Sequence, residues 1–323
     1  MLRRLLFAAV LVLAAGAAEA QNAAGAWPDR PIRLLVPFAP GGVTDTIGRM
    51  SADWLSRRLG QPVAVENRTG AAGAIAAEAV ARARPDGYTL LTASASQMVM
   101  LPALTALSFD PAADLTGVSI VASNPMVLGV AARTGAATLS DFVALARREA
   151  GRLDFSSAGQ GSSNHLAMEL LLHRAGIRLQ HVTYRGGAPA MQALLTGEVA
   201  AYFGNPIDLL PHMQNPAIRV LGVASARRLD AMPDVPTVME AGFPDFVAEN
   251  WNGIAAPAGT PAGITARIAQ ELALACQEAA FRQRLLGLGT TPLCSTPAAF
   301  QAAMRRDAPI WREAVRASGA RQE

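Results

Sequence analysis

Apolar and polar residues alternate along this chain in a unit that recurs four times. Each unit has a short apolar run, then a loop rich in Gly, Ala, Ser or Asn, and then an amphipathic stretch with helical periodicity. In the first copy, residues 32–38 form the apolar run, residues 39–42 the loop and residues 46–59 the helix, which Thr44 or Asp45 can cap. Strands that alternate with helices predict an α/β fold in which parallel sheets are covered by helices on both faces.

The series of units stops and then starts again, which predicts two lobes. The interruption is a helix expected at residues 139–150, and no low-complexity linker marks it. Residues 227–251 contain three prolines and predict an extended return over the surface. We therefore expect the chain to cross between the lobes more than once, with residues 21–127 and 226–323 in the first lobe and residues 128–225 in the second.

The N-terminus has the organisation of an export signal. Arg3 and Arg4 precede an apolar run at residues 5–18, and small residues at Ala18 and Ala20 suit a signal peptidase. We expect cleavage after Ala20 and a protein located in the periplasm. Gln21 follows where a lipid-anchored protein would have Cys, so no lipid anchor is expected.

The charged residues exclude several kinds of chemistry. All 28 basic residues are Arg, which removes the P-loop lysine, the Schiff-base lysine and the Ser-Lys nucleophile pair. The net charge is +3, and no basic tract could neutralise a row of phosphates, so nucleic acid is not an expected partner.

Two cysteines, Cys276 and Cys294, leave two interpretations open. In an oxidising compartment they could form one disulfide, but two separate thiols are equally compatible with the sequence. No metal site is expected, because His165 and His173 are too far apart for the i, i+4 spacing of a zinc pair.

Glycine-rich loops follow four of the expected strands and suggest anion binding. They contain residues 41–42, 70–73, 159–161 and 186–187. In an open α/β sheet such loops form the ligand crevice, and each following helix directs its free N–H groups into it. A single loop of this kind is more often only a tight turn, but four together favour a site. None is a nucleotide signature, so no cofactor is expected.

Individual polar and aromatic residues near these loops allow more than one role. Ser163 and His165 could be a nucleophile and its base, although no G-x-S-x-G turn is present, and the serines are better placed to cap a helix and contact a ligand. Tyr184 and Trp251 could cover a bound molecule or pack in the core. Asp45 is expected to cap its helix, or to accept hydrogen bonds that hold the loop or a water molecule.

Several long segments resemble the tripartite tricarboxylate transporter substrate-binding family, also described as TctC-like or Bug extracytoplasmic solute receptors. They cover nearly all of the chain beyond residue 20: residues 27–45 (WPDRPIRLLVPFAPGGVTD), 60–91, 151–203, 233–242 (PDVPTVMEAG) and 251–261 (WNGIAAPAGTP). Compared with its relatives, this chain has Gly204 where Asp is common, Ala200 where an acid is frequent, and Arg185 where Lys is common.

The resemblance implies a type II periplasmic binding protein fold, with two lobes that each contain a mostly parallel sheet flanked by helices. It implies a monomer without catalytic activity that binds a small carboxylate in the cleft between the lobes and delivers it to a large and a small membrane subunit. Presentation of the ligand to a membrane sensor kinase is the alternative, and an exported serine hydrolase using Ser163 and His165 is a third hypothesis. The expected ligand-binding residues are Pro40, Gly41, Gly42, Thr44, Asp45, Ser94, Ser96, Gln97, Ser157, Gly159, Gly161, Ser162, Ser163, His165, Tyr184, Gly186, Gly187, Ala188 and Asn205.

Overall fold

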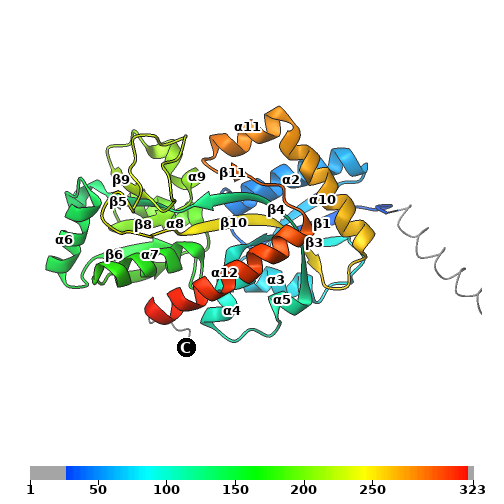
Figure 1. Cartoon of the computed structure of the whole chain (residues 1–323), viewed down its shortest axis with the longest axis horizontal. Helices are drawn as coiled ribbons and strands as arrows, with labels where there is room; N and C mark the ends of the chain where they lie inside the picture. Colours follow the sequence, from blue (N-terminus) through cyan, green and yellow to red (C-terminus); the bar gives the residue numbers. More distant parts are fainter. Residues whose placement is uncertain (1–26, 319–323) are drawn as a thin grey trace, which may run out of the picture.

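The computed structural model describes residues 27–318 and places them in two lobes that lie side by side (Figure 1). Each lobe is built on its own sheet. The first lobe has six strands in the order β11-β4-β10-β3-β1-β2, and the second has five in the order β7-β6-β8-β5-β9. The expected signal peptide, residues 1–20, lies outside the described residues.

The first lobe contains the N-terminal units and the C-terminal helices. Its strands are β1 (Ile32–Val36), β2 (Val63–Asn67), β3 (Thr89–Ser94), β4 (Leu115–Pro125), β10 (Glu249–Pro257) and β11 (Thr291–Pro292). Its helices are α2 (Val43–Leu59), η1 (Ala71–Gly73), α3 (Ala74–Ala81), η2 (Ser96–Met100), α4 (Leu101–Leu104), α5 (Pro111–Asp114), α10 (Ala262–Gln277), α11 (Ala279–Gly287) and α12 (Pro297–Ser318).

The second lobe is formed by the middle of the chain. Its strands are β5 (Val127–Ala131), β6 (Asp154–Ser157), β7 (Gln180–Thr183), β8 (Ala201–Gly204) and β9 (Ile218–Val223). Its helices are η3 (Ala132–Thr134), α6 (Leu139–Glu149), α7 (Ser163–Ala175), α8 (Gly187–Leu195), α9 (Pro206–Leu209) and η4 (Leu210–His212).

Both sheets are mixed, which corrects the expectation of mostly parallel sheets. The repeated units do give parallel pairs: β1 with β2 and β3, and β6 with β7 and β8. The strands next to the crossings are antiparallel, namely β10 with β3 and β4, and β5 with β8 and β9. The reason is topological, because β4 leads the chain out of the first lobe and β10 brings it back alongside.

The chain crosses between the lobes at a point where three segments are hydrogen bonded to one another. The Met126 nitrogen donates to the Ala248 carbonyl (3.0 Å), the Ala224 nitrogen to the Met126 carbonyl (2.7 Å), and the Ala248 nitrogen to the Ala224 carbonyl (2.9 Å). These residues are buried. The three bonds therefore connect the crossing segments in a buried region between the two sheets.

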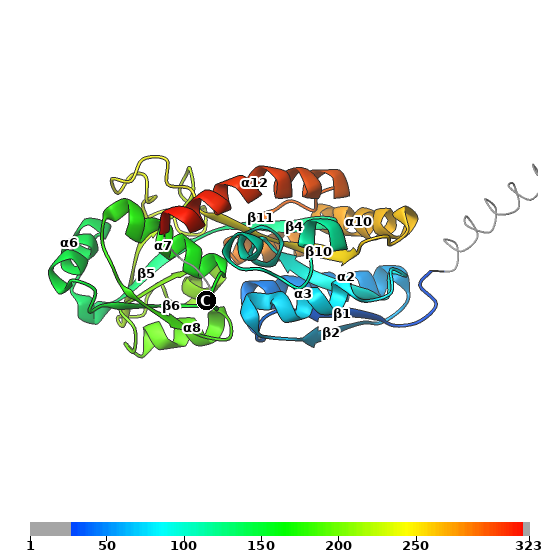
Figure 2. The ribbon, with the colours of Figure 1, turned by 90° about the horizontal axis from the view of Figure 1, so that it is seen from below.

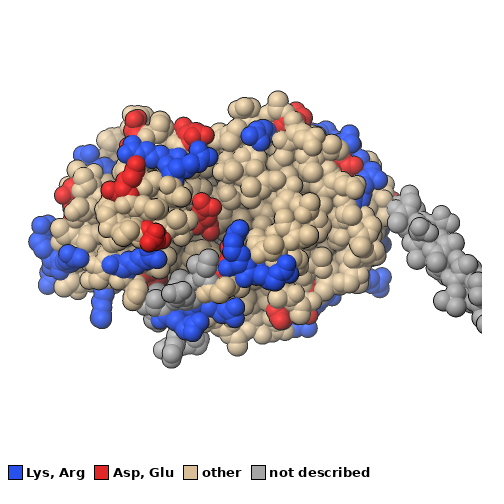
Figure 3. Space-filling view, in the orientation of Figure 1, with Lys and Arg blue, Asp and Glu red and all other residues tan. Residues whose placement is uncertain are grey.

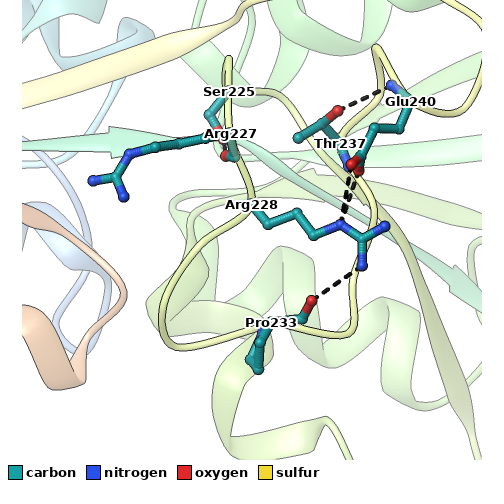
Figure 4. Close-up of polar contacts among 6 residues, drawn as sticks. All are labelled: Ser225, Arg227, Arg228, Pro233, Thr237 and Glu240. Carbon is teal, nitrogen blue, oxygen red and sulfur yellow. Dashed lines mark hydrogen bonds and ion pairs between the residues drawn. The ribbon is translucent and has the colours of Figure 1, made fainter.

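The predicted extended return before β10 contains turns and is held by its own polar contacts. Arg228 donates to Glu240 through Nε (2.9 Å) and to the Pro233 carbonyl (3.2 Å). Glu240 also accepts from the Thr237 nitrogen, and its own nitrogen donates to Thr237 Oγ1 (Figure 4). These bonds stabilise a segment that has no helix or strand between β9 and β10.

Helix α12 joins the two lobes from one side. It packs on β4 and α4 of the first lobe and on α7 of the second, and Figure 1 shows it running from one lobe to the other. On this side, one cluster of buried apolar residues continues from the first lobe into the second. A separate cluster in the first lobe includes residues of α2 and α10, and another in the second lobe includes residues of α8 and β9.

Cys276 and Cys294 form a disulfide that links α10 to the segment after β11. The sequence left open whether these cysteines form a disulfide or remain two thiols, and the structure shows the disulfide. Both cysteines lie in the first lobe.

The surface mixes both signs of charge. On the face seen in Figure 3, Arg and acidic side chains are interspersed, and wide areas between them carry neither. Within residues 27–318, no helix combines the length and apolar character needed to cross a membrane.

Candidate functional site

A small cavity, here called the inner cavity, lies between the two lobes. Its volume is about 20 Å³, little more than the space for one water molecule. It is lined from the first lobe by Phe38, Gly42, Val43, Thr44 and Asn250, and from the second by Ala158, Ser162, Ser163, Asn164, Gly187 and Asn205. Six of these were expected from the sequence: Gly42, Thr44, Ser162, Ser163, Gly187 and Asn205.

The first helix at this cavity begins earlier than predicted. Helix α2 starts at Val43 instead of Thr46, and Gly42 precedes it without any side-chain cap. The expected caps are used elsewhere, because Thr44 Oγ1 donates to Asn252 Oδ1 (2.6 Å) and Asp45 accepts from the Gly41 nitrogen. The N–H groups of the first turn of α2 are therefore left without a capping side chain beside the cavity.

Two helices of the second lobe also begin at the inner cavity. Ser162 caps α7, with its side chain accepting from the His165 nitrogen (3.4 Å), so that Ser163 and Asn164 form the first turn. Helix α8 begins at Gly187. Each of the three helices directs its positive dipole end and free N–H groups towards the same space. None of the described residues that line this cavity is charged.

The glycine loops of the two lobes approach each other directly. A Cβ atom built on Gly41 would lie 3.8 Å from the Ala188 Cβ of the opposite lobe. A Cβ atom built on Gly186 would lie 3.2 Å from the Ala39 Cβ. At Gly159 the Ala72 Cα would be 3.6 Å away. Figure 2 shows the two lobes side by side. The predicted glycine loops thus share one hollow.

A larger cavity, here called the outer cavity, continues from the inner one. It has a volume of about 510 Å³ and shares Phe38 and Ala158 with the inner cavity. The expected residues Gly159 and Tyr184 line it, together with Arg185, its one charged residue among those described. It is further lined by Thr69, Gly70, Ala71, Ala72, Gly73, Ile75, Gln160 and Thr183.

Asp45 holds the loop that precedes α2 instead of lining a cavity. Its carboxylate accepts from the Gly41 nitrogen (3.0 Å), from Arg49 Nε (2.9 Å) and from Asn67 Nδ2 (2.8 Å). Burial alone would raise the pKa of Asp45, but the hydrogen bonds from Arg49, Asn67 and Gly41 outweigh it and lower the pKa. Asp45 is thus an ionised anchor for the glycine loop. Pro40, in the same loop, is exposed and lines neither cavity.

A second group of expected ligand residues supports the loops from behind. Gln97 Oε1 accepts from both the nitrogen and the hydroxyl of Ser94, and Gln97 Nε2 donates to the Ala72 carbonyl (3.3 Å). Ser96 Oγ donates to the Gly161 carbonyl (3.2 Å) and so connects the two lobes. These four residues, Ser94, Ser96, Gln97 and Gly161, line neither cavity.

His165 lies beneath the site in a buried stack. Its ring lies 4.0 Å from that of His181 between centroids, and Phe155 stacks on His181 at 4.8 Å. His165 Nδ1 accepts from the Gly161 nitrogen (3.1 Å), and Ser157 Oγ is 2.6 Å from His181 Nε2. The stack therefore fixes both ends of the loop that follows β6. His165 and Ser157 line neither cavity.

The proposed nucleophile and base do not face each other. Ser163 Oγ accepts from Asn250 Nδ2 (3.0 Å), and the second ring nitrogen of His165, Nε2, lies 3.7 Å from Glu169. Since Nδ1 is taken by Gly161, His165 presents no free nitrogen to Ser163. The geometry gives no support to the serine hydrolase hypothesis.

Asn250 was not predicted, and for its neighbour Trp251 the sequence left open whether it covers a ligand or packs in the core. The two residues point to opposite faces of β10, as successive residues of a strand do. Trp251 is 3% exposed, packs on Phe300 and donates to Asp307 Oδ2 (3.0 Å), so it belongs to the core. The available signal for Asn250 was the alternation of Asn250 and Asn252 around Trp251 in a strand that is apolar from residue 253 onwards.

Gly204 leaves no room for a side chain, because a buried ring fills the space. A Cβ on Gly204 would lie 2.0 Å from Cε1 of Tyr202. The Tyr202 hydroxyl donates to Asp208 Oδ2 (2.7 Å) and accepts from Asn164 Nδ2 (3.1 Å). Asp208, four residues later in the sequence, thus holds the Tyr202 ring in place but lines neither cavity.

Comparison with known sequences identifies the family. A model described as the tripartite tricarboxylate transporter family receptor matches residues 47–305. The chain belongs to this family. The members are periplasmic solute receptors, and the family is one of binding proteins and not of enzymes. Protein BugT of Bordetella pertussis is 35% identical over 320 residues, which covers 98% of each chain. A protein from the tcbD–tcbE intergenic region of Pseudomonas sp. is 36% identical over 291 residues, 89% of this chain and 86% of its own.

Solved structures of the same fold include ligand complexes. MatC from Rhodopseudomonas palustris, solved with bound malate, is 31% identical with a TM-score of 0.86, covering 90% of this chain and 100% of its own. An R. palustris protein solved with adipate is 30% identical with a TM-score of 0.87, covering 91% and 98%. The periplasmic binding protein BugD is 29% identical with a TM-score of 0.87, covering 92% and 100%. The chain thus has the expected periplasmic binding protein fold.

Proposed function

We propose that this protein captures a small carboxylate in the inner cavity, for uptake by the large and small membrane subunits of a tripartite tricarboxylate transporter. In this proposal the protein acts in the periplasm as a monomer after cleavage behind Ala20. The lobe of residues 21–127 and 226–323 closes onto the lobe of residues 128–225. The ligand is released when the lobes separate.

The observation that carries the proposal is the meeting of three helix N-termini at one uncharged cavity. Helix α2 comes from the first lobe and α7 and α8 from the second, so an anion bound there would be held by both lobes at once. Backbone N–H groups and helix dipoles favour an anion without the need for a cationic side chain. Such a ligand stabilises the closed form because its contacts are complete only when the lobes meet.

The two cavities suggest where each part of the ligand binds. In this proposal the carboxylate group binds at the inner cavity, which has to widen beyond its volume of about 20 Å³ to take it, and the rest of the molecule extends past Phe38 and Ala158 into the outer cavity. Arg185 and Tyr184 would face that distal part. The malate and adipate in the related structures are carboxylates, which supports this class of ligand.

A thermal-shift screen of mono-, di- and tricarboxylates tests the proposal. A ligand at 100 times its Kd stabilises a protein by about 2.7 kcal/mol, which is readily measured as a rise in Tm. The neutral amides of the same acids serve as controls, since they keep the size and lose the charge. If no carboxylate in the panel raises the Tm, the proposal is wrong.

Delivery to a transporter is tested separately from binding. The ligand-loaded protein is used to pull down detergent-solubilised membrane subunits of a tripartite transporter, and a sensor kinase in parallel. Retention of the transporter subunits supports uptake, while retention of the kinase alone would assign the bound protein to signalling.

A further inference from the structure

A separate cavity, here called the crossing cavity, lies where the chain passes between the lobes. Its volume is about 340 Å³, and it shares no lining residue with the inner or the outer cavity. Pro125, Ser225 and Glu249 line it, and each is the immediate neighbour of one of the three residues that are hydrogen bonded to one another at the crossing. Its other walls are residues 226–231 of the second lobe, and α11 with residues 289–292 of the first. A ligand in this cavity would therefore contact both lobes.

The charged residues that line the crossing cavity are mostly basic. They are Arg227, Arg228, Arg282, Asp230 and Glu249. The Arg228 guanidinium is already engaged, since it donates to Glu240 and to the Pro233 carbonyl (Figure 4). The other two arginines have no such strong partner.

The two acidic residues neutralise these arginines only in part. Burial raises the pKa of Glu249, and the charged groups that act on it, Arg306 and Asp307, lie on α12 outside this cavity. Asp230 Oδ1 lies 3.7 Å from Arg227 Nη1, which is beyond hydrogen-bond distance, and both side chains are at least 80% exposed. An exposed pair of this kind contributes little. The cavity therefore keeps a surplus of positive charge.

One arginine from each lobe remains available to a ligand. Among the described residues, the Arg282 side chain on α11 has no hydrogen-bond or ion-pair partner. In Figure 4 the Arg227 side chain points away from the pair formed by Arg228 and Glu240. A guanidinium group presents paired N–H donors that match the oxygens of a phosphate or a carboxylate.

We propose that the crossing cavity is a second anion site, in which a small oxyanion is bound between Arg282 of the first lobe and Arg227 of the second. Inorganic phosphate is the probe for this class of ligand. Because the anion contacts both lobes, it stabilises the arrangement in which they are packed together. The second site goes beyond the proposed function, and only its coupling to carboxylate capture rests on that function.

A contact between the lobes connects the crossing cavity to the inner cavity. Gly289 lines the crossing cavity, and a side chain at this position would collide with Pro206 of the second lobe. Pro206 directly follows Asn205, which lines the inner cavity. Both cavities are therefore complete only while the lobes are packed together, and an anion in either one favours the same arrangement. By linkage, each anion raises the affinity of the other.

Calorimetric titration of the purified protein with its best carboxylate tests this coupling, in phosphate buffer and in chloride buffer of the same pH and ionic strength. We expect the Kd of the carboxylate to be at least about fivefold lower in phosphate, the lower end of the usual coupling between two sites. In Arg282→Gln and in Arg227→Gln this difference should disappear. The Kd in chloride should stay the same, because neither arginine lines the inner or the outer cavity.

The Tm measured without any carboxylate tests the second site independently of the proposed function. Phosphate should raise the Tm relative to chloride in the unaltered protein, but not in the two arginine variants. Arg284→Gln is the matched control, because it removes an exposed arginine two residues further along α11 that does not line the crossing cavity. This variant should keep both effects of phosphate.

Each remaining outcome has a distinct meaning. The second site does not exist if phosphate changes neither the Tm nor the Kd of the unaltered protein, or if its effects are equal in Arg282→Gln and Arg284→Gln. A higher carboxylate Kd in phosphate would place phosphate in the inner cavity as a competitor, and it would also overturn the proposal. A rise in Tm that depends on Arg282, in a protein that no carboxylate stabilises, would instead overturn the proposed function and leave the second site standing.

Discussion

Gly42 and Gly187 face each other across the cleft, so close that a Cβ built on Gly42 would lie 4.0 Å from the Gly187 nitrogen. An alanine at Gly42 would still fit, but a longer side chain would enter the space that the opposite helix N-terminus occupies. The backbone of Gly42 has a φ of −78°, which any residue adopts. A small residue is therefore needed here for the approach of the lobes, and glycine is not required by the turn.

Gly42→Leu should prevent closure without harming the fold. We expect the Kd of the best carboxylate to rise about 100-fold, equivalent to about 2.7 kcal/mol, in a calorimetric titration. Gly287→Leu is the matched control, because nothing lies within 4 Å of a Cβ at that end of α11. Unchanged affinity in Gly42→Leu would show that the ligand does not require the lobes to meet at this point.

The Asp45 anchor should matter for binding although it does not line a cavity. Asp45→Ala frees the Gly41 nitrogen, Arg49 and Asn67, and we expect it to lower the free energy of unfolding by about 1–3 kcal/mol and to weaken binding about 10-fold, as the loop before α2 loosens. Urea unfolding and calorimetry measure the two effects.

Asp53→Ala is the control for this change. Asp53 also pairs with an arginine one turn away on α2, but both side chains are more than half exposed. Its removal should change stability by no more than about 0.5 kcal/mol. Equal effects of the two substitutions would mean that Asp45 contributes only a surface ion pair.

The glycine loops could be predicted from the sequence because their signal is local. A glycine pair after an apolar run places a loop at the carboxyl end of a strand, and Gly42 and Gly187 do lie at the cavity. The same signal led to the prediction of Ser94 and Gln97 as ligand-binding residues, but they line neither cavity. They follow a strand and so share its edge of the sheet, but they bond to each other and to Ala72 behind the loop.

Contacts that depend on register or on the opposite lobe could not be predicted in this way. Asn250 lines the inner cavity and the next residue, Trp251, does not. Which of the two faces the cavity depends on the register of β10 with β4. Thr44, predicted as a cap of the first helix, instead donates to Asn252, over two hundred residues away.

The disulfide should stabilise the first lobe without affecting the ligand. Cys276 and Cys294 are separated by 18 residues, and closing a loop of this size contributes about 3 kcal/mol by restricting the unfolded chain. The double variant Cys276→Ser with Cys294→Ser should lose about that much in urea unfolding, and the carboxylate Kd should stay the same. A large loss of affinity would show that the bond also positions the cleft.

The buried stack beneath the β6 loop makes stability depend on pH. Burial, with a smaller effect of the neighbouring His181, lowers the pKa of His165 from 6.5 to about 3, and burial lowers that of His181 to about 4. Burial raises the pKa of Glu169 from 4.5 to about 7. Between pH 4.5 and 6.5 the unfolded chain therefore carries protons on both histidines, while the folded protein carries one on Glu169.

In that interval the unfolded state binds one more proton than the folded state, so the free energy of unfolding should rise with pH by about 1.4 kcal/mol per unit. His181→Gln removes one of the two histidine protons and should make the slope nearly flat, whereas Glu169→Gln removes the opposing proton and should double it. Chemical unfolding at several pH values measures the three slopes. If both variants keep the slope of the unaltered protein, the stack does not titrate as buried groups do, and the loop that carries Gly159 and Gly161 is open to water.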